Sequence, residues 1–261
     1  MKSYEFCNVE REGPLTIITL NRPEVMNALH PPAHFELAEV FDNFASDPEQ
    51  WVGIVTGAGE KAFSAGNDLK YQASGGKMSS PPSGFAGLTS RFDLDKPLIA
   101  AVNGLAMGGG FEIALACDII IAADTASFAL PEPRVGLAAL AGGLHRLPRT
   151  IGDKRALGMI LTGRRVDAKE GQALGFVNDV VPAADLMTTA KKWAQQILAL
   201  SPMSVRASKQ AVYKGLMEPS VEAGLKAQAK YPAVAAMFKS EDFVEGPMAF
   251  AQKRPPQLKG K

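Results

Sequence analysis

The stretch AVNGLAMGGGFEIALACDIIIAADTASFALPE, from Ala101 to Glu132, carries the strongest indication of fold and chemistry in this chain. An apolar run enters three consecutive glycines, Gly108 to Gly110, and a helical pattern with Glu112 in its first turn follows at once. The first N–H groups of a helix have no intrahelical partner, so main-chain donors and a carboxylate meet at this junction. Glycines there also let a ligand carbonyl approach the main chain. This is the layout of an oxyanion site beside a base, although tight packing and an ordinary first-turn acid explain these residues equally well.

Two flanking segments strengthen the first interpretation without proving it. Glu132 lies between Pro131 and Pro133, which exclude it from a helix interior and hold it on a rigid connection. Upstream, the segment KAFSAGNDLK at 61–70 follows an apolar run with another loop of small residues. Its Asp68 is a candidate helix N-cap. Taken alone, each segment is equally compatible with a surface turn.

Short apolar runs with helical patterns between them organise the first two thirds of the chain. A helix with Leu37, Phe41 and Phe44 on one face is predicted to stop near Pro48. Strands that alternate with helices indicate an α/β fold with mainly parallel pairing. The runs read as buried strands, and they are LTIITL (15–20), WVGIVTG from Trp51, PLIAAVNG from Pro97 and DIIIAAD from Asp118.

The pattern changes from Ala183 onward, where the segments read as helices only. The last third is therefore predicted to be an all-helical extension. The segment from Ser74 to Gly87 is rich in Gly, Ser and Pro, so we expect a mobile surface loop beside the site. One helical stripe is formed by Leu186, Ala190, Trp193, Ile197 and Leu200.

Composition excludes several classes of function. The chain has 261 residues, of which 46% are apolar, and 28 basic residues against 27 acidic ones leave a net charge of +1. No basic field would attract nucleic acid or an anionic membrane surface. No uncharged apolar run approaches the roughly 18 residues that span a bilayer, and the first residues lack the pattern of a signal peptide. Cys7 and Cys117 form neither a disulfide framework nor a metal-ligand spacing, so we expect a cytoplasmic protein.

Several catalytic motifs are absent from the sequence. His30 and His34 have zinc-ligand spacing, but Pro31 and Pro32 between them favour a helix N-terminus instead. Neither glycine-rich segment matches a nucleotide-binding motif, and there is no nucleophile elbow of a serine hydrolase. His145 is better explained as a residue that packs or caps a helix.

Taken together, these segments resemble the enoyl-CoA hydratase/isomerase (crotonase) superfamily over essentially the whole chain. The resemblance is carried in order by LNRPEVMNAL (20–29), FSAGNDLK, GGGFE, MILTGRRVDAKEGQALGFVNDVVP (159–182) and SEDFVEGPMAFAQKRPP (240–256). It implies an α/β fold, a crotonase-like spiral of ββα units at 1–200 with a C-terminal helical oligomerisation region at 201–261. A homotrimer or dimer of trimers is implied, with no redox cofactor and no metal.

The resemblance also implies an activity, the reversible addition of water to a 2-enoyl-CoA thioester. Glu112 and Glu132 match the two acid/base positions of hydratases, and the backbone N–H groups of Asn67 and Gly109 match the oxyanion hole. Coenzyme A is expected as part of the substrate. Its binding residues by this resemblance are Ala65, Gly66, Asp68, Leu69, Lys70 and Arg22, with Lys61 also available, and Phe250 and Lys253 of a neighbouring subunit.

Two alternatives stay open within the same family. The stretches GFAGLT, DKPLIAAVNG and SFALPE are especially similar to the carnitinyl-CoA dehydratase branch, which interconverts crotonobetainyl-CoA and carnitinyl-CoA. An enoyl-CoA isomerase is the other alternative, but it needs only one base. Leu140 stands where hydratases commonly have glycine, which puts the usual substrate pose in question.

Overall fold

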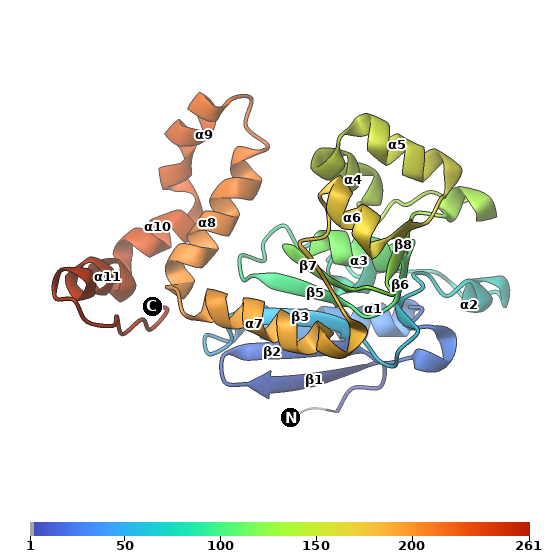
Figure 1. The fold of residues 1–261 in the computed structure, drawn as a ribbon, viewed down its shortest axis with the longest axis horizontal. Coiled ribbons are helices and arrows are strands. Elements are labelled where there is room, and N and C mark those ends of the chain that lie inside the picture. The colour runs from blue at the N-terminus through green and yellow to red at the C-terminus, as the bar shows by residue number, and fades with distance from the viewer. Residues whose placement is uncertain (1–2) are drawn as a thin grey trace.

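A six-stranded sheet organises the computed structural model, which describes residues 3–261 (Figure 1). In spatial order its strands are β1 (Cys7–Glu12), β2 (Leu15–Leu20), β3 (Val52–Gly57), β5 (Leu98–Val102), β7 (Ile119–Ala123) and β10 (Asp179–Val181). All neighbours pair in parallel except β1 and β2. Strands β3 and β5 are buried along their whole length, so they read as continuous apolar runs. The charged β1 forms one edge, where its side chains oppose pairing with another chain.

A second, smaller sheet runs beside the first. Its strands are β4 (Ala62–Ser64), β6 (Leu105–Met107), β8 (Ser127–Ala129) and β9 (Val166–Asp167). Strands β4, β6 and β8 are parallel and follow β3, β5 and β7 along the chain. The chain therefore passes from the large sheet to the small sheet and into a helical segment three times in succession. These repeated ββα units confirm the predicted α/β spiral with parallel pairing.

Helices surround the two sheets, and α7 packs against β3, β5 and β7. His30 is the N-cap of α1, and the prolines after it form its first turn, so the predicted helix N-terminus is confirmed. Helix α7 ends at Leu198, and Leu200 is exposed, so the last member of the predicted stripe does not belong to it. These helices are α1 (Pro31–Ser46), α2 (Leu69–Ala73), α3 (Gly109–Ala116), α4 (Gly143–Ile151), α5 (Asp153–Thr162), α6 (Ala168–Leu174) and α7 (Leu186–Leu198).

Short 3-10 turns connect these elements. They are η1 (Pro23–Val25), η2 (Phe85–Gly87), η3 (Glu132–Val135), η4 (Ala183–Asp185) and η5 (Gln228–Lys230). Turn η2 corrects the prediction of a surface loop over 74–87. Ser74 and its successors are mostly exposed, but Ala86 and Gly87 are buried against α1. The end of this segment is therefore part of the packed interior.

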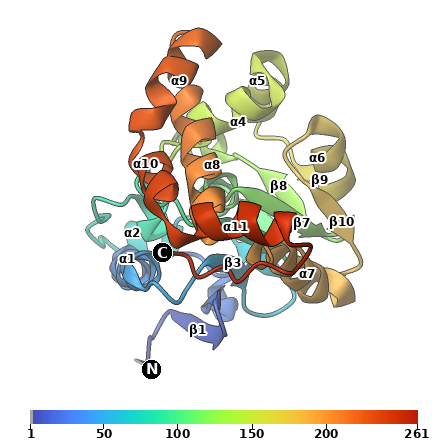
Figure 2. The same cartoon turned by 90° about the vertical axis from the view of Figure 1, so that its left-hand side faces the viewer.

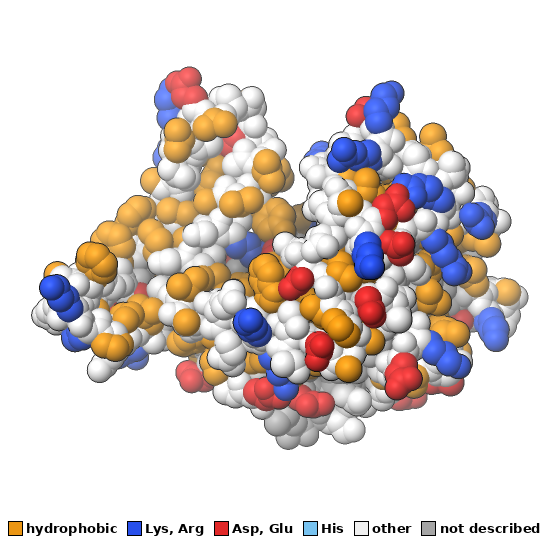
Figure 3. All heavy atoms as spheres, in the orientation of Figure 1, with side chains coloured by type: hydrophobic (Ala, Val, Ile, Leu, Met, Phe, Trp, Pro, Cys, Tyr) orange, Lys and Arg blue, Asp and Glu red, His pale blue; other side chains and the backbone are white. Residues whose placement is uncertain are grey.

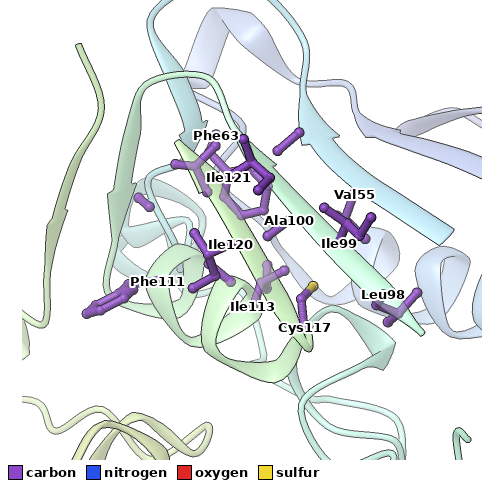
Figure 4. Packing of buried hydrophobic residues seen from close by; sticks show 14 of the residues in the cluster. Val55, Phe63, Leu98, Ile99, Ala100, Phe111, Ile113, Cys117, Ile120 and Ile121 are labelled. Atoms are coloured by element: carbon purple, nitrogen blue, oxygen red, sulfur yellow. The ribbon is translucent and has the colours of Figure 1, made fainter. Parts of the chain in front are cut away.

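The hydrophobic core is one cluster that extends over both sheets and the helices packed on them, and Figure 4 shows part of it, where side chains of β5, β7 and α3 lie close together. Next to β8 of the small sheet, the rings of Phe111, Phe128 and Phe176 pack against one another, with centroids 5.0 to 5.2 Å apart. Phe111 lies on α3 and Phe128 on β8, the strand that leads to Glu132. The cluster therefore fixes two of the elements that carry the predicted glutamates.

Four helices form a C-terminal arm that projects from one end of the body (Figures 1 and 2). They are α8 (Pro202–Gly215), α9 (Val221–Ala227), α10 (Pro232–Lys239) and α11 (Glu241–Ala251). The arm has its own small buried cluster, formed by Ala207, Tyr231 and Val234. Lys209 and Tyr213 tie it to the body through Asp118, at 2.7 and 3.0 Å. The helical extension is thus confirmed, while a domain boundary at residue 200 stays a prediction.

No helix within residues 3–261 is long and apolar enough to cross a membrane.

Replacing Phe128 by alanine should lower the free energy of unfolding by about 3–5 kcal/mol, because it leaves a cavity in a fully buried aromatic cluster. Phe92→Ala is the matched control, since that ring is 81% exposed. Urea unfolding of both variants measures the difference. An equal loss in the two variants would show that the aromatic cluster is not a principal source of stability.

Candidate active site

Each of the three glycines after β6, of which Gly109 and Gly110 begin α3, has a different neighbour. A Cβ on Gly108 would lie 2.9 Å from Glu132 Oε1, and one on Gly109 would lie 2.5 Å from the Phe85 ring. A Cβ on Gly110 would lie 2.0 Å from the carbonyl oxygen of Ser64. Gly108 also has a φ of +54°, which favours glycine. All three positions therefore need glycine, and together they bring a carboxylate, an aromatic ring and a second loop to the start of α3.

The second loop, residues 64–68, is held by main-chain hydrogen bonds to Leu29. Gly66 O accepts from Leu29 N at 2.7 Å, and Asp68 N donates to Leu29 O at 2.8 Å. Between them, Asn67 N donates to no group in the described chain, and neither does Gly109 N at the start of α3. A Cβ on Gly66 would lie 2.7 Å from Gly109 N. The structure thus brings the two predicted oxyanion donors onto adjoining loops with both N–H groups free, while their role stays a prediction.

Glu112 projects from the first turn of α3 and is only 3% exposed. Its Oε1 accepts a 2.8 Å hydrogen bond from Gly143 N, the first residue of α4. Burial, together with the charge of Glu132, raises the pKa of this carboxyl to about 7, although the Gly143 and Ala141 N–H groups act in the opposite direction. Near neutral pH, Glu112 therefore exchanges a proton readily.

Glu132 begins η3, directly after β8 and Pro131. Its Oε2 atom is buried and makes no hydrogen bond within residues 3–261. Burial raises the pKa of this carboxyl as well. Since the charge of Glu132 raises the pKa of Glu112, the two carboxyls are coupled and titrate as a pair.

This arrangement supports proton transfer next to a developing oxyanion. One carboxyl can accept a proton while the other donates one, and free N–H groups stabilise negative charge more strongly in a dry site than in water. Among the described residues, no three His, Cys, Asp or Glu side chains gather as a set of metal ligands. The geometry is that of a general acid and base beside a main-chain anion site.

The predicted coenzyme A residues divide into two groups. Ala65, Gly66 and Leu69 lie on or beside the loop next to Gly109, and Lys70 is exposed on α2. Arg22, in contrast, has partners of its own. It donates to Asp68 Oδ2 at 3.0 Å and to the carbonyl oxygen of Ala28 at 2.5 Å. Arg22 therefore supports the loop through this ion pair, and a phosphate would have to compete with Asp68 for it.

Phe250 and Lys253 lie far from this loop within the chain. Figure 1 shows α11 at one end of the molecule and α2 at the other. Phe250 is 86% exposed on α11, and Lys253 follows the helix with a φ of +54°. The chain does not bring these two residues to its own site, and their contact with a neighbouring subunit's coenzyme A stays a prediction.

Two features of the site escaped the sequence analysis, and Leu140, which it had questioned, is now placed. The N–H of Gly143 holds Glu112, but the segment GLAALAGG, which ends at Gly143, offers no capping side chain. Phe85 lies against Gly109, and a loop-like composition gave no sign of it. The Leu140 side chain is 80% exposed, so it does not fill the space around Glu112. The pair Gly142 and Gly143 was the available sequence signal for the contact with Glu112.

Comparison with known proteins identifies what the chain is similar to. The model of the enoyl-CoA hydratase/isomerase family matches residues 10–261. The carnitinyl-CoA dehydratase of Citrobacter koseri is 48% identical, covering 98% of this chain and 99% of that protein. The crystal structure of an enoyl-CoA hydratase from Mycobacterium marinum superposes with a TM-score of 0.91 at 38% identity, over 98% of this chain and 99% of the other. A carnitinyl-CoA hydratase from Mycobacterium avium gives 0.78 at 39% identity, over 99% and 100%.

The raised pKa of Glu112 predicts a pH dependence of stability. Folded protein keeps a proton that the unfolded chain has released, so the free energy of unfolding should fall as the pH rises from about 4.5 to about 7. Glu112→Gln removes this effect. The free energy of unfolding of the variant, relative to that of the wild type, should therefore rise by about 2 kcal/mol between pH 5 and pH 8. Urea unfolding at both pH values measures it, with the exposed Glu60→Gln as control. A difference between wild type and Glu112→Gln that does not change with pH would contradict the assignment.

Proposed function

Because the chain belongs to the enoyl-CoA hydratase/isomerase family, we propose that it adds water reversibly to the double bond of a 2-enoyl-CoA thioester. The observation that carries this proposal is the meeting of two glutamates, the buried Glu112 and the half-buried Glu132, with two free N–H groups. A hydratase needs a group that activates water and a group that protonates carbon. An isomerase needs only one base, so the presence of both glutamates favours hydration.

The free N–H groups of Asn67 and Gly109 are proposed to bind the thioester oxygen. As water adds to the β-carbon, the α-carbon becomes enolate-like and negative charge moves onto this oxygen. Fixed donors stabilise that charge more than they stabilise the ground state. Only the main chain of Asn67 is needed, and its side chain turns instead to Gln72 at 2.9 Å.

The two glutamates are proposed to move the protons jointly. Water gives its oxygen to the β-carbon and one proton to the carboxyl pair, and the pair returns a proton to the α-carbon. The free Oε2 of Glu132 is available to hold the water, and Glu112 is held by Gly143 N. No redox step occurs, so the reaction needs neither a redox cofactor nor a metal, and the enzyme is a lyase.

Crotonobetainyl-CoA is the second candidate substrate, because relatives 46% to 48% identical are named carnitinyl-CoA dehydratase. Both candidates undergo the same chemistry at the same atoms and differ only in the group beyond the β-carbon. A short 2-enoyl-CoA such as crotonyl-CoA lacks the trimethylammonium group. Loss of the conjugated absorbance with each thioester distinguishes the two, and the one with the higher kcat/KM is the better candidate.

Coenzyme A is proposed to lie along the loop of Ala65 to Lys70. Lys61, before this loop, and Lys70, at its end, are both exposed and available to bind phosphates. With a net charge of only +1, attraction of an anionic ligand must be local.

We further propose a homotrimer or dimer of trimers that works in the cytoplasm in acyl-CoA metabolism, for example of fatty acids. Figure 3 shows hydrophobic side chains over the arm of α8 to α11. An exposed apolar surface of this kind marks a protein contact. Leu216, Met217, Val221 and Leu225 are its most exposed members on and around α8 and α9.

Glu112→Gln and Glu132→Gln should each lose about 10² to 10⁴ in kcat for hydration of the better substrate, with binding largely kept. The double variant should be little worse than either one, because the pair acts as a unit. Glu60→Gln, an exposed glutamate, should keep full activity. Hydration at the wild-type rate by Glu132→Gln would eliminate the mechanism that uses two carboxyls.

Lys70→Ala should raise KM by about threefold to tenfold and leave kcat nearly unchanged, since a contact remote from the reacting atoms is lost. Lys154→Ala on α5 is the control for the loss of one positive charge. Steady-state kinetics and calorimetry with coenzyme A measure both effects. If Lys70→Ala binds coenzyme A with the same affinity as the wild type, Lys70 does not contact coenzyme A.

A further inference from the structure

A buried histidine supports the turn that covers the start of α3. His34 lies on α1 and is 1% exposed. Its Nδ1 accepts a 3.1 Å hydrogen bond from Ala86 N, and its ring lies 4.3 Å from the Phe85 ring, centroid to centroid. Burial lowers the pKa of this imidazole to about 4, and the nearby His30 adds to the effect. His34 is therefore neutral at physiological pH, and its Nδ1 is available as an acceptor.

The turn needs this support because its backbone is strained. Ala86 has φ 55° and ψ 20°, a left-handed conformation that is uncommon for a residue with a Cβ. Ala86 is also fully buried, so its N–H has no access to water and would be left unpaired without His34. On the other side, a Cβ on Gly87 would lie 2.3 Å from the main chain of Ala38. The turn is thus clamped onto α1 by one hydrogen bond and one close backbone contact.

Phe85 directly precedes Ala86, so the anchored turn fixes the position of the Phe85 ring beside the site. Its ring lies against the Cα of Gly109, where a Cβ would come within 2.5 Å of Cζ. The Gly109 N–H is one of the two donors assigned above to the thioester oxygen. A thioester oxygen bound by this N–H brings its acyl group close to Gly109, so we expect the Phe85 ring to face the part of the acyl group beyond the reacting carbons. A ring held there limits the length and breadth of the group it can admit.

We propose that Phe85 is the residue that restricts this enzyme to short acyl groups, and that His34 is the positioning residue that holds Phe85 there through the Ala86 hydrogen bond. The inference rests on the proposed function, because it takes Gly109 as the site of the thioester oxygen. It adds two residues that neither touch the reacting carbons nor exchange protons. A histidine that only filled the core would affect stability and leave acyl preference unchanged.

Two substitutions at His34 separate its hydrogen bond from its volume. His34→Asn keeps an acceptor, since Asn Oδ1 occupies nearly the position of His Nδ1. His34→Leu fills similar volume and removes the acceptor, which leaves the Ala86 N–H unpaired. Phe85→Ala removes the ring directly. Phe35→Ala, at the neighbouring half-exposed position on α1, is the control.

The readout is a preference ratio, kcat/KM for 2-decenoyl-CoA over kcat/KM for crotonyl-CoA. Phe85→Ala and His34→Leu should each raise this ratio by about tenfold or more, the size of effect expected when an apolar pocket changes by a few methylenes. His34→Asn and Phe35→Ala should leave it near the wild-type value. In the Phe85→Ala background, His34→Leu should add little, because both changes act on one ring.

A second readout does not need turnover. The ratio of dissociation constants for decanoyl-CoA and butyryl-CoA, measured by calorimetry, should shift in favour of decanoyl-CoA in the same variants. If His34→Leu does not fold, His34→Ala, which also removes the acceptor for Ala86 N, takes its place beside Phe85→Ala and His34→Asn. An unchanged preference in Phe85→Ala, or a shift in His34→Asn as large as in Phe85→Ala, would overturn the inference. If the variants shift the ratio of dissociation constants as predicted but the wild type hydrates no thioester, the proposed function is refuted and the role of Phe85 in acyl-group binding is kept.

Discussion

The site depends on the close contact between the loop of residues 64–68 and the first turn of α3. Gly110 comes so near the Ser64 carbonyl that no Cβ fits between them, and Gly66 meets Gly109 N in the same way. This contact requires each ββα unit to place its loop directly against the next, which the parallel pairing of β4 with β6 achieves. As a result, Asn67 and Gly109 present free N–H groups on adjoining loops. A larger residue at either glycine would separate the loops and the two donors with them.

Two carboxyls, the buried Glu112 and the half-buried Glu132, are then held beside these donors at some cost in stability. Each glutamate is taken out of water, and each disfavours the charge of the other. The N–H groups at the start of α4 offset part of this cost for Glu112, while Glu132 keeps one oxygen without a protein partner. An unsatisfied buried oxygen in a native protein calls for an explanation, and a water or substrate that binds there supplies one. The arrangement is therefore understandable as a site built for proton transfer rather than for stability.

The sequence was sufficient to predict β2, β3, β5 and β7 of the large sheet, because buried parallel strands are continuous apolar runs. The glycines before Glu112 and the prolines around Glu132 drew attention to both glutamates, while their acid/base roles came from the family resemblance and stay a prediction. The repetition of the ββα unit was not visible, because the units share geometry and not residues, and their second strands are only three residues long. Turn η2 was read as part of a surface loop, because Gly, Ser and Pro dominate the segment before it. His34 was correctly placed at a helix start, but its bond to Ala86, 52 residues away, depends on tertiary packing.

The account stands or falls on where the thioester binds, and a crystal structure of the protein with butyryl-CoA tests this most directly. Butyryl-CoA is a suitable probe because it has no double bond to hydrate. The account predicts that the thioester oxygen accepts hydrogen bonds from both Asn67 N and Gly109 N. The α- and β-carbons should face Glu112 and Glu132, with the acyl end against the Phe85 ring. A thioester bound away from these two N–H groups, or an acyl chain directed away from the two glutamates, would contradict it.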